Sequence, residues 1–256
     1  MELWEKDLFN NRNIFYLFNK DIVEYDMKEA GFSLTREHKL LSEEKIQNLL
    51  SYPKEERHIR LGYEQRENHV FKDALKNAFI EARKSFITEN ELDENDIISI
   101  KKDALFVTRK CSHQSFGDYV LFREKNHYTS YIRLSAQVEF FYNENQIDVK
   151  GIRPEKLADH EPFMLKFIKQ YFYKMETEPP VKVIDFLRRF ITKYKERRLE
   201  AGYYQKFSRE SGYDLIANED SEQQGTFISP YSTNVEGIDI TYNFYEVLIK
   251  LIKIPL

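Results

Sequence analysis

The spacing of apolar residues changes near residue 96, and this change constrains the fold more than any other feature of the sequence. Before it, residues 70–87 (VFKDALKNAFIEARKSFI) follow a helical period, which predicts one buried face. After it, residues 96–149 form short runs rich in β-branched and aromatic residues, typical of strands. We therefore expect an α+β fold with an antiparallel sheet backed by helices. The residues expected on the buried helix face are Val70, Leu75, Phe79, Ala82 and Phe86.

The stretch DIISIKKDALFVTRK, residues 96–110, predicts a β-hairpin with Asp103 at its turn. Aspartate is a common turn-forming residue, yet a carboxylate at a hairpin tip is also a suitable metal ligand. Asp26 offers a similar choice, because it ends a predicted strand in residues 13–26. Glu29, three residues on, would complete a capping box with Asp26 as the helix N-cap. Both interpretations of each aspartate stay open at this point.

Further helices are predicted on both sides of the sheet-forming segment. Apolar spacing indicates helices in residues 27–41 and 42–52, and Ser42 is a suitable N-cap for the second. Residues 153–200 form two helical runs separated by TEPP, whose prolines end one helix and start the next. Residues 208–237 read as a long polar loop, followed by a closing helix.

Charge and cysteine content narrow the classes of function. The chain has 39 Lys and Arg against 43 Asp and Glu, a net charge of −4, so its overall field does not indicate nucleic acid. Segment 181–206 differs, with eight basic and three acidic residues. Arg188 and Arg197 in this segment are candidate phosphate contacts, and a solvated helix face is the alternative. Cys111 is the single cysteine, which excludes an internal disulfide and multi-cysteine metal sites.

The sequence also predicts where the protein is found. No apolar run approaches the roughly 20 residues of a membrane span. The N-terminal residues MELWEKDLFNNRN lack the basic and apolar regions of a signal peptide. We expect a cytoplasmic protein with no membrane association, in a bacterial or phage-infected cell, since the high Lys, Asn, Ile and Tyr content is typical of an AT-rich genome.

The order of motifs resembles the palm and thumb of a family B DNA polymerase. The matching elements are EYDMKEAGFSL at 24–34, SIKKDALFV at 99–107, KNHYTSYIRL at 125–134, DVKGI at 148–152, and the helices from 153 onward. This resemblance implies a palm-like domain over residues 1–152, with a helical insertion at about 35–92. It also implies a helical thumb-like region over 153–256.

The resemblance further implies roles for individual residues. Asp26 and Asp103 match the two metal-binding aspartates, which would hold Mg²⁺ or Mn²⁺ for two-metal phosphoryl transfer onto a primer. Ser33 follows the first aspartate in its motif, and Lys76 and Arg83 could meet a nucleoside triphosphate. The positions that match contacts to the nucleic acid, expected to be DNA, are Lys125, Tyr128, Lys150 and Gly151.

Several positions depart from the family pattern. Lys101 stands where the hairpin usually carries a first acid, and Gly31 stands where a bulky tyrosine usually discriminates against ribonucleotides. The insertion lacks the family's finger signature, and we expect no exonuclease domain. Two alternatives follow: an inactive palm-like protein that binds nucleic acid or assists replication proteins, and a phage regulator that binds another protein.

Overall fold

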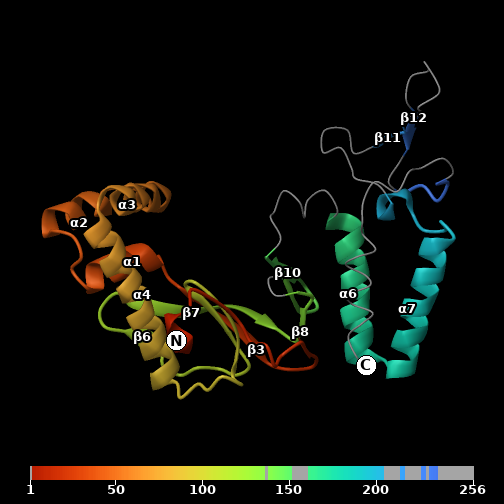
Figure 1. Cartoon of the computed structure of the whole chain (residues 1–256), viewed down its shortest axis with the longest axis horizontal. Helices are drawn as coiled ribbons and strands as arrows, with labels where there is room; N and C mark the ends of the chain where they lie inside the picture. The colour runs from red at the N-terminus through yellow and green to blue at the C-terminus, as the bar shows by residue number, and fades with distance from the viewer. Residues whose placement is uncertain are drawn as a thin grey trace. The chain divides into compact units, whose positions relative to one another are not determined.

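The chain divides into two compact units (Figure 1). Unit 1 comprises Met1–Ile14 and Lys20–Tyr128, and unit 2 comprises Phe15–Asn19 and Thr129–Leu256. The computed structural model describes residues 2–135, 138–151, 161–204, 214–216, 226–228 and 231–235. Unit 1 thus ends at residue 128, whereas the sequence analysis placed the boundary after residue 152. The strands that follow Tyr128 pair with residues 16–17 in unit 2 and not with the sheet of unit 1.

Unit 1 is a six-stranded antiparallel sheet with helices inserted between two of its strands. The strand order is β1-β4-β5-β3-β7-β6, so β5 lies between β3 and β4, which the helices connect. This is a split β-α-β arrangement. Its elements are η1 (Leu3–Glu5), β1 (Leu8–Asn10), β3 (Ile22–Met27), α1 (Ala30–Glu37), α2 (Glu43–Leu50), α3 (Lys54–Glu67), α4 (His69–Glu89), β4 (Ile97–Lys101), β5 (Ala104–Val107), β6 (Ser115–Phe116) and β7 (Val120–Tyr128).

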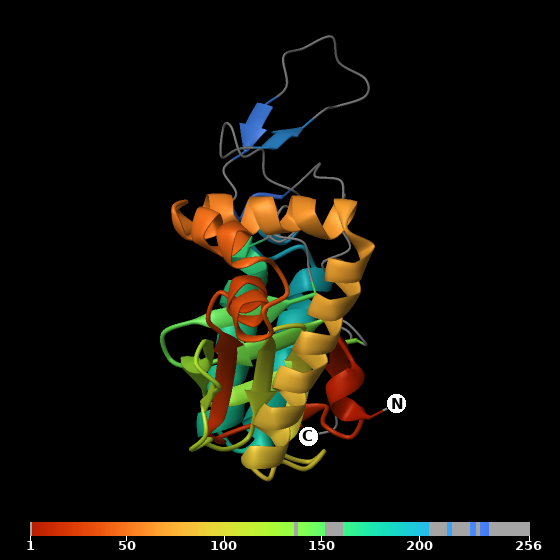
Figure 2. The same ribbon diagram turned by 90° about the vertical axis from the view of Figure 1, so that its left-hand side faces the viewer.

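The helices cover one face of this sheet. Figure 2 shows α4 lying along the strands of unit 1, with α3 crossing its end. Alternate residues of β3, namely Val23, Tyr25 and Met27, belong to the core that α4 completes. The Tyr25 and Phe86 rings lie 5.1 Å apart between centroids. Because successive side chains of a strand point to opposite faces, Glu24 and Asp26 lie on the face away from these helices.

Local sequence signals explain how the helices begin. The Ser42 hydroxyl accepts a hydrogen bond from the Lys45 amide at 3.4 Å, so the predicted N-cap of α2 is confirmed. Asn68 caps α4 in the same way, through the Phe71 amide at 3.0 Å. The sequence analysis missed α3, because only Leu61 of that helix is buried and its apolar period is weak.

One residue of the predicted buried face of α4 was wrong. Val70 is 81% exposed, whereas its neighbour Phe71 is only 2% exposed. Phe71 stands four residues before Leu75 and eight before Phe79, so it belongs to the same helical stripe. The other four residues predicted for this face are buried, namely Leu75, Phe79, Ala82 and Phe86.

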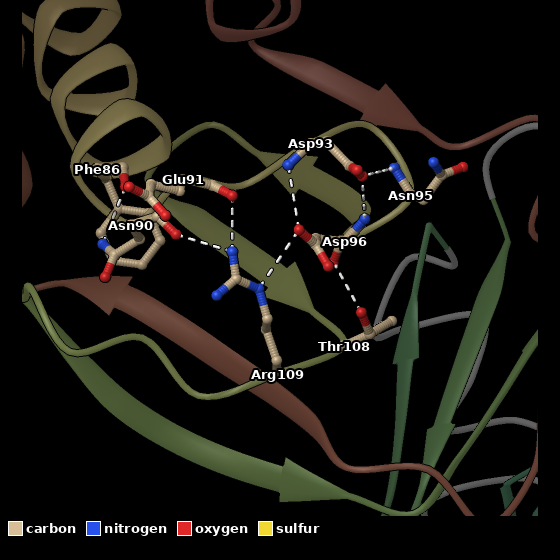
Figure 3. Close-up of polar contacts among 8 residues, drawn as sticks. All are labelled: Phe86, Asn90, Glu91, Asp93, Asn95, Asp96, Thr108 and Arg109. Atoms are coloured by element: carbon tan, nitrogen blue, oxygen red, sulfur yellow. Dashed lines mark hydrogen bonds and ion pairs between the residues drawn. The ribbon is translucent and has the colours of Figure 1, made fainter.

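A polar network joins the end of α4 to the segments just before β4 and just after β5 (Figure 3). Arg109 donates to the carbonyl oxygens of Asn90 at 2.8 Å and Glu91 at 2.7 Å, and its Nε lies 3.3 Å from Asp96 Oδ2. The Arg109 side chain is half exposed, so its ion pair contributes little and the bonds to backbone dominate. The network fixes the base of the β4–β5 hairpin, whose turn carries Asp103.

Unit 2 combines a four-stranded antiparallel sheet with two long helices. The sheet order is β10-β9-β8-β2, and its apolar side chains share a core with α6 and α7. Pro180 occupies the first turn of α7, as the TEPP motif predicts. The elements are β2 (Tyr16–Leu17), β8 (Ser130–Arg133), β9 (Glu139–Tyr142), β10 (Ile147–Lys150), α6 (Glu161–Thr177), α7 (Pro180–Lys195), η2 (Ala201–Tyr203), β11 (Asp214–Ile216) and β12 (Thr226–Ile228).

The α+β class expected from the sequence is confirmed by these two antiparallel sheets and their helices. Most of the polar segment 208–237 lies outside the described residues, which show two short paired strands there, β11 and β12. The predicted closing helix lies wholly outside the described residues. In the part of the chain that the structure describes, no helix has the length and apolar content needed to cross a membrane.

Candidate functional site

Strand pairing brings the β4–β5 turn, which carries Asp103, next to the end of β3 that carries Asp26. Lys102 and Asp103 form a two-residue turn between β4 and β5, and Lys102 has a φ of 61°. The Asp103 carbonyl accepts a hydrogen bond from the Met27 amide at 3.0 Å, and Asp26 is paired in register with Ala104. The two predicted aspartates, far apart in the sequence, therefore lie on neighbouring parts of the backbone.

The structure also tests the simpler interpretations of the two residues. Asp26 lies inside β3, and Glu29 is the N-cap residue of α1, with a φ of 47°, so Asp26 is not a helix cap. Asp103 is a turn residue, as expected. A turn residue can still be functional, because a hairpin tip projects its side chain from the sheet.

The electrostatics of Asp103 are unfavourable for its ionised form. Burial raises the pKa of the Asp103 carboxyl above its ordinary value, and the nearby negative charge of Asp26 raises it further. A backbone hydrogen bond and the charges of Lys102 and Lys125 oppose this rise. Among the described residues, no cation lies within 4.0 Å of the Asp103 carboxylate. A bound cation would relieve this unfavourable charge.

A β-bulge brings Lys125 to the same group of acids. Glu24 pairs with Asn126 and Tyr25 pairs with Glu124, so Lys125 is an extra residue in β7. Bulges commonly redirect a side chain near functional sites. The Lys125 ammonium lies 3.5 Å from Glu24 Oε1 and 3.7 Å from Asp26 Oδ1.

Arg123 adds a second positive charge from β7. Its guanidinium lies 3.3 Å from Asp26 Oδ2, and the two residues face each other directly in the strand register. The pair is partly exposed, with 49% of the Arg123 side chain accessible, so it can open without exposing the core.

Glu24 forms the buried centre of this group and was missed in the sequence analysis. Only 1% of Glu24 is exposed, and its Oε2 accepts hydrogen bonds from Tyr128 Oη at 2.9 Å and Asn126 Nδ2 at 2.7 Å. The alternation in IVEYDM places Glu24 on the same strand face as Asp26, which was the available signal. Tyr128, which the resemblance assigns to nucleic-acid contact, is 1% exposed, and its hydroxyl donates to Glu24.

The residues present suit a divalent cation only in part. Carboxylates are the ligands that Mg²⁺ and Mn²⁺ prefer, and Asp26 and Asp103 supply them from the end of β3 and the adjoining β4–β5 turn. Across the described ranges, no group of three or more His, Cys, Asp or Glu side chains is arranged to hold a metal. Mg²⁺ usually completes its shell with water and substrate phosphate, so two protein carboxylates are sufficient for such an ion.

Arg83, predicted to meet a triphosphate, instead supports the hairpin turn. Its side chain is fully buried and donates to the carbonyl oxygens of Trp4 at 2.8 Å and Lys102 at 3.0 Å, and to Asp7 Oδ1 at 3.0 Å. Burial lowers the pKa of the Arg83 guanidinium, while the charges of Asp7 and Asp103 oppose that effect. All the hydrogen bonds described for this guanidinium go to protein atoms, which gives Arg83 a structural role beside its predicted nucleotide contact.

A pocket of about 420 Å³ in unit 1 offers other basic side chains, and we call it the α1–α3 pocket. Ser33 lines this pocket, but its hydroxyl donates to the Lys28 carbonyl at 2.7 Å. Lys76 is exposed on α4 and is not among the lining residues. The basic and aromatic side chains of its lining, together with Ser33, are Lys28, Phe32, Arg36, Arg57 and Tyr119.

Two arginines of the α1–α3 pocket are held by aromatic rings. Arg36 lies 3.8 Å from the centroid of the Tyr119 ring, and Arg57 lies 4.7 Å from that of Phe32. Arg57 contacts the Glu29 carboxylate at 3.5 Å, while its buried Nε has no hydrogen-bond partner. A buried N–H group without an acceptor is costly, so an anion at this point would be stabilised. Sequence analysis missed Arg57, because it lies on the unpredicted helix α3.

The remaining predicted contacts to nucleic acid belong to unit 2. Lys150 is half-buried, with its ammonium 3.6 Å from Asp148 Oδ2, and Gly151 has a φ of 84°. Arg188 and Arg197 are exposed. These residues belong to unit 2, whereas Glu24, Asp26 and Asp103 belong to unit 1.

Comparison with known proteins gives one family. The chain belongs to the family described as Bacteriophage PBS1 gene 130 protein, which it matches over residues 1–251. No curated protein matches the chain. The family description names a phage gene product, which supports the phage origin indicated by the composition. It names neither a polymerase nor any other activity.

Proposed function

We propose that unit 1 of this phage-family protein is the palm-like core of a nucleotidyltransferase, resembling that of family B DNA polymerases. The observation that carries the proposal is the half-buried Asp103 carboxylate beside Asp26, with no cation within 4.0 Å of it in the described residues. Asp26 is paired with Arg123 and Lys125, whereas, among the described residues, the burial of the Asp103 carboxylate is not compensated by such a partner. A carboxylate perturbed by burial and by a second carboxylate is a candidate for a functional site.

Each group of the site would have a distinct part. Asp26 and Asp103 would hold Mg²⁺ or Mn²⁺. Such an ion would activate a primer hydroxyl and stabilise the leaving phosphate. In the α1–α3 pocket, Arg36 and Arg57 would bind the oxygens of a nucleoside triphosphate. Lys125, from its bulge, would orient the primer strand while keeping Glu24 neutralised.

A second function, binding nucleic acid without catalysis, is favoured by Lys125. Its ammonium lies between Glu24 and Asp26, at 3.5 and 3.7 Å, and already offsets part of the negative charge. Lys101 stands where the polymerase family has an acid, and it donates to Asn10 Oδ1 at 2.6 Å. In this function the carboxylates would only position basic side chains for a phosphate backbone.

Calorimetric titration of Mn²⁺ separates the two functions. Wild type is compared with the Asp26→Asn, Asp103→Asn double variant and with Asp73→Asn, a control that removes one exposed carboxylate of α4. Catalysis predicts binding heat in wild type and the control, strengthened by a primed template and nucleotide, and none in the double variant. Equal heats in all three proteins would refute the metal site.

Primer extension then tests the activity itself. Labelled primer on a DNA or an RNA template is incubated with deoxy- or ribonucleotides and Mn²⁺. Extension that disappears in the double variant and persists in Asp73→Asn is the expected result. Binding of primed template without extension, under conditions where Mn²⁺ binds, would favour the inactive alternative.

A further inference from the structure

Unit 2 contains a basic groove that belongs to none of the sites above. It lies between α6, α7 and the segment leading into η2, and its volume is about 700 Å³. Six basic side chains line it, against two acidic ones. The charged lining residues are Lys166, Lys174, Lys182, Arg189, Lys193, Arg198, Glu178 and Glu200.

Both acids of this groove are already neutralised by lysines. The Lys166 ammonium lies 3.1 Å from Glu200, and the ammonium groups of Lys174 and Lys182 lie 3.0 and 3.6 Å from Glu178. Arg198 is paired with Glu196 outside the lining, so among the described lining residues the positive charges of Arg189 and Lys193 are in excess. Such an excess, concentrated on one side of a chain whose net charge is negative, attracts an anion.

Two basic residues are available to a ligand. Arg189 and Lys193 stand one helical turn apart on α7 and are both exposed. Within the described ranges, neither has an acidic side chain within 4.0 Å; Arg189 donates only to the Asp185 carbonyl, at 3.3 Å. Residues one turn apart on a helix have Cβ atoms roughly 5–6 Å apart, so both side chains can meet neighbouring phosphates of one strand.

Aromatic rings form the wall beside these cations. Phe186 and Phe190 are half-buried, so each presents part of its ring to the groove. The Phe190 and Tyr203 rings are 5.5 Å apart between centroids, at an angle of 72°. Aromatic faces next to a positively charged track are the arrangement that single-stranded nucleic acids use, because bases stack on the rings while phosphates meet the cations.

We infer that this groove binds a short single-stranded segment of nucleic acid. Its volume of about 700 Å³ is enough for a nucleotide or two, and its aromatic wall favours unpaired bases over a duplex. Arg189 lines the groove, whereas the neighbouring Arg188, the candidate phosphate contact predicted from the sequence, does not. Binding here requires no divalent cation, so the inference does not depend on the carboxylate site of unit 1.

Fluorescence polarisation of a labelled oligothymidylate 12-mer, in EDTA, tests the inference. The variant Arg189→Glu, Lys193→Glu is compared with Arg188→Glu, Lys195→Glu, which makes the same charge change at exposed positions of α7 outside the groove. We expect the groove variant to weaken binding about tenfold or more, and the control about threefold or less. Circular dichroism establishes that both variants are folded.

Further binding measurements identify the ligand class. Phe190→Leu should weaken binding of the oligonucleotide but not of inorganic polyphosphate, because only bases stack. The Asp26→Asn, Asp103→Asn variant should bind as wild type does, which separates this groove from the proposed catalytic site. Equal weakening by both charge variants, tighter binding of a duplex, or equal binding of an abasic strand would each overturn the inference.

Discussion

Replacing Arg83 with methionine should lower the free energy of unfolding of unit 1 by about 2–4 kcal/mol. The buried guanidinium donates to the carbonyl oxygens of Trp4 and Lys102, at 2.8 and 3.0 Å. Hydrogen bonds from a charged donor contribute about 1.5–3 kcal/mol each. The ion pair with Asp7 adds little, because 52% of that carboxylate side chain is exposed. Relief of the buried charge and the packing of methionine offset part of the loss.

Urea unfolding followed by tryptophan fluorescence measures this effect. Trp4 is the single tryptophan and belongs to unit 1, so its signal reports on that unit. Lys76→Met, at an exposed position of the same helix, is the matched control and should change stability by less than about 0.5 kcal/mol. A loss below about 1 kcal/mol in Arg83→Met would refute the structural role assigned to the guanidinium.

The other predictions concern charge and accessibility. Asp103→Asn should raise the free energy of unfolding at pH 7, because the raised pKa of Asp103 penalises its ionised form. This gain in stability should shrink as the pH falls through the raised pKa toward the ordinary pKa of an aspartate. A gain that does not change with pH in urea titrations would contradict this sign. Lys125→Met should tighten Mn²⁺ binding about tenfold, equivalent to ~1.4 kcal/mol, because it removes the ammonium group near Asp26. Unchanged or weaker binding in calorimetry would show that Lys125 does not compete with the cation. Burial raises the pKa of the Cys111 thiol to about 11, so a thiol reagent at pH 8 should label it only in urea, and rapid labelling of the folded protein would contradict its burial.

The two functions proposed for unit 1 differ in what Lys125 does. If the carboxylates hold a cation, its arrival must displace the Lys125 ammonium from Asp26, because both compete for the same oxygens. Glu24 would retain its hydrogen bonds from Tyr128 and Asn126, so the bulge of β7 stays anchored. If no cation binds, Lys125 simply completes the charge balance. The Lys125→Met titration therefore discriminates between the functions as well as testing a contact.

The sequence alone determined the class of fold and most of its elements, because period and turn chemistry are local properties. Ser42 caps α2, the residues KKDA form the predicted hairpin turn, and Pro180 begins α7. It also predicted that Asp26 and Asp103 would be neighbours, through the order of motifs rather than through any local signal. Helix α3 was not predicted, since a helix with one buried residue has almost no periodic pattern of apolar residues.

Only the tertiary structure decided which side chains are available to a ligand. Arg83 and Tyr128 look like surface contacts in the sequence, yet one supports a turn and the other binds Glu24. Arg57 gains its importance from its unsatisfied Nε, which no sequence pattern reveals. Burial and hydrogen bonding depend on residues far apart in the chain, so the same arginine or tyrosine can be structural or functional. The physical reason is that the three-dimensional fold, and not local sequence, sets how much solvent and how many partners each polar atom meets.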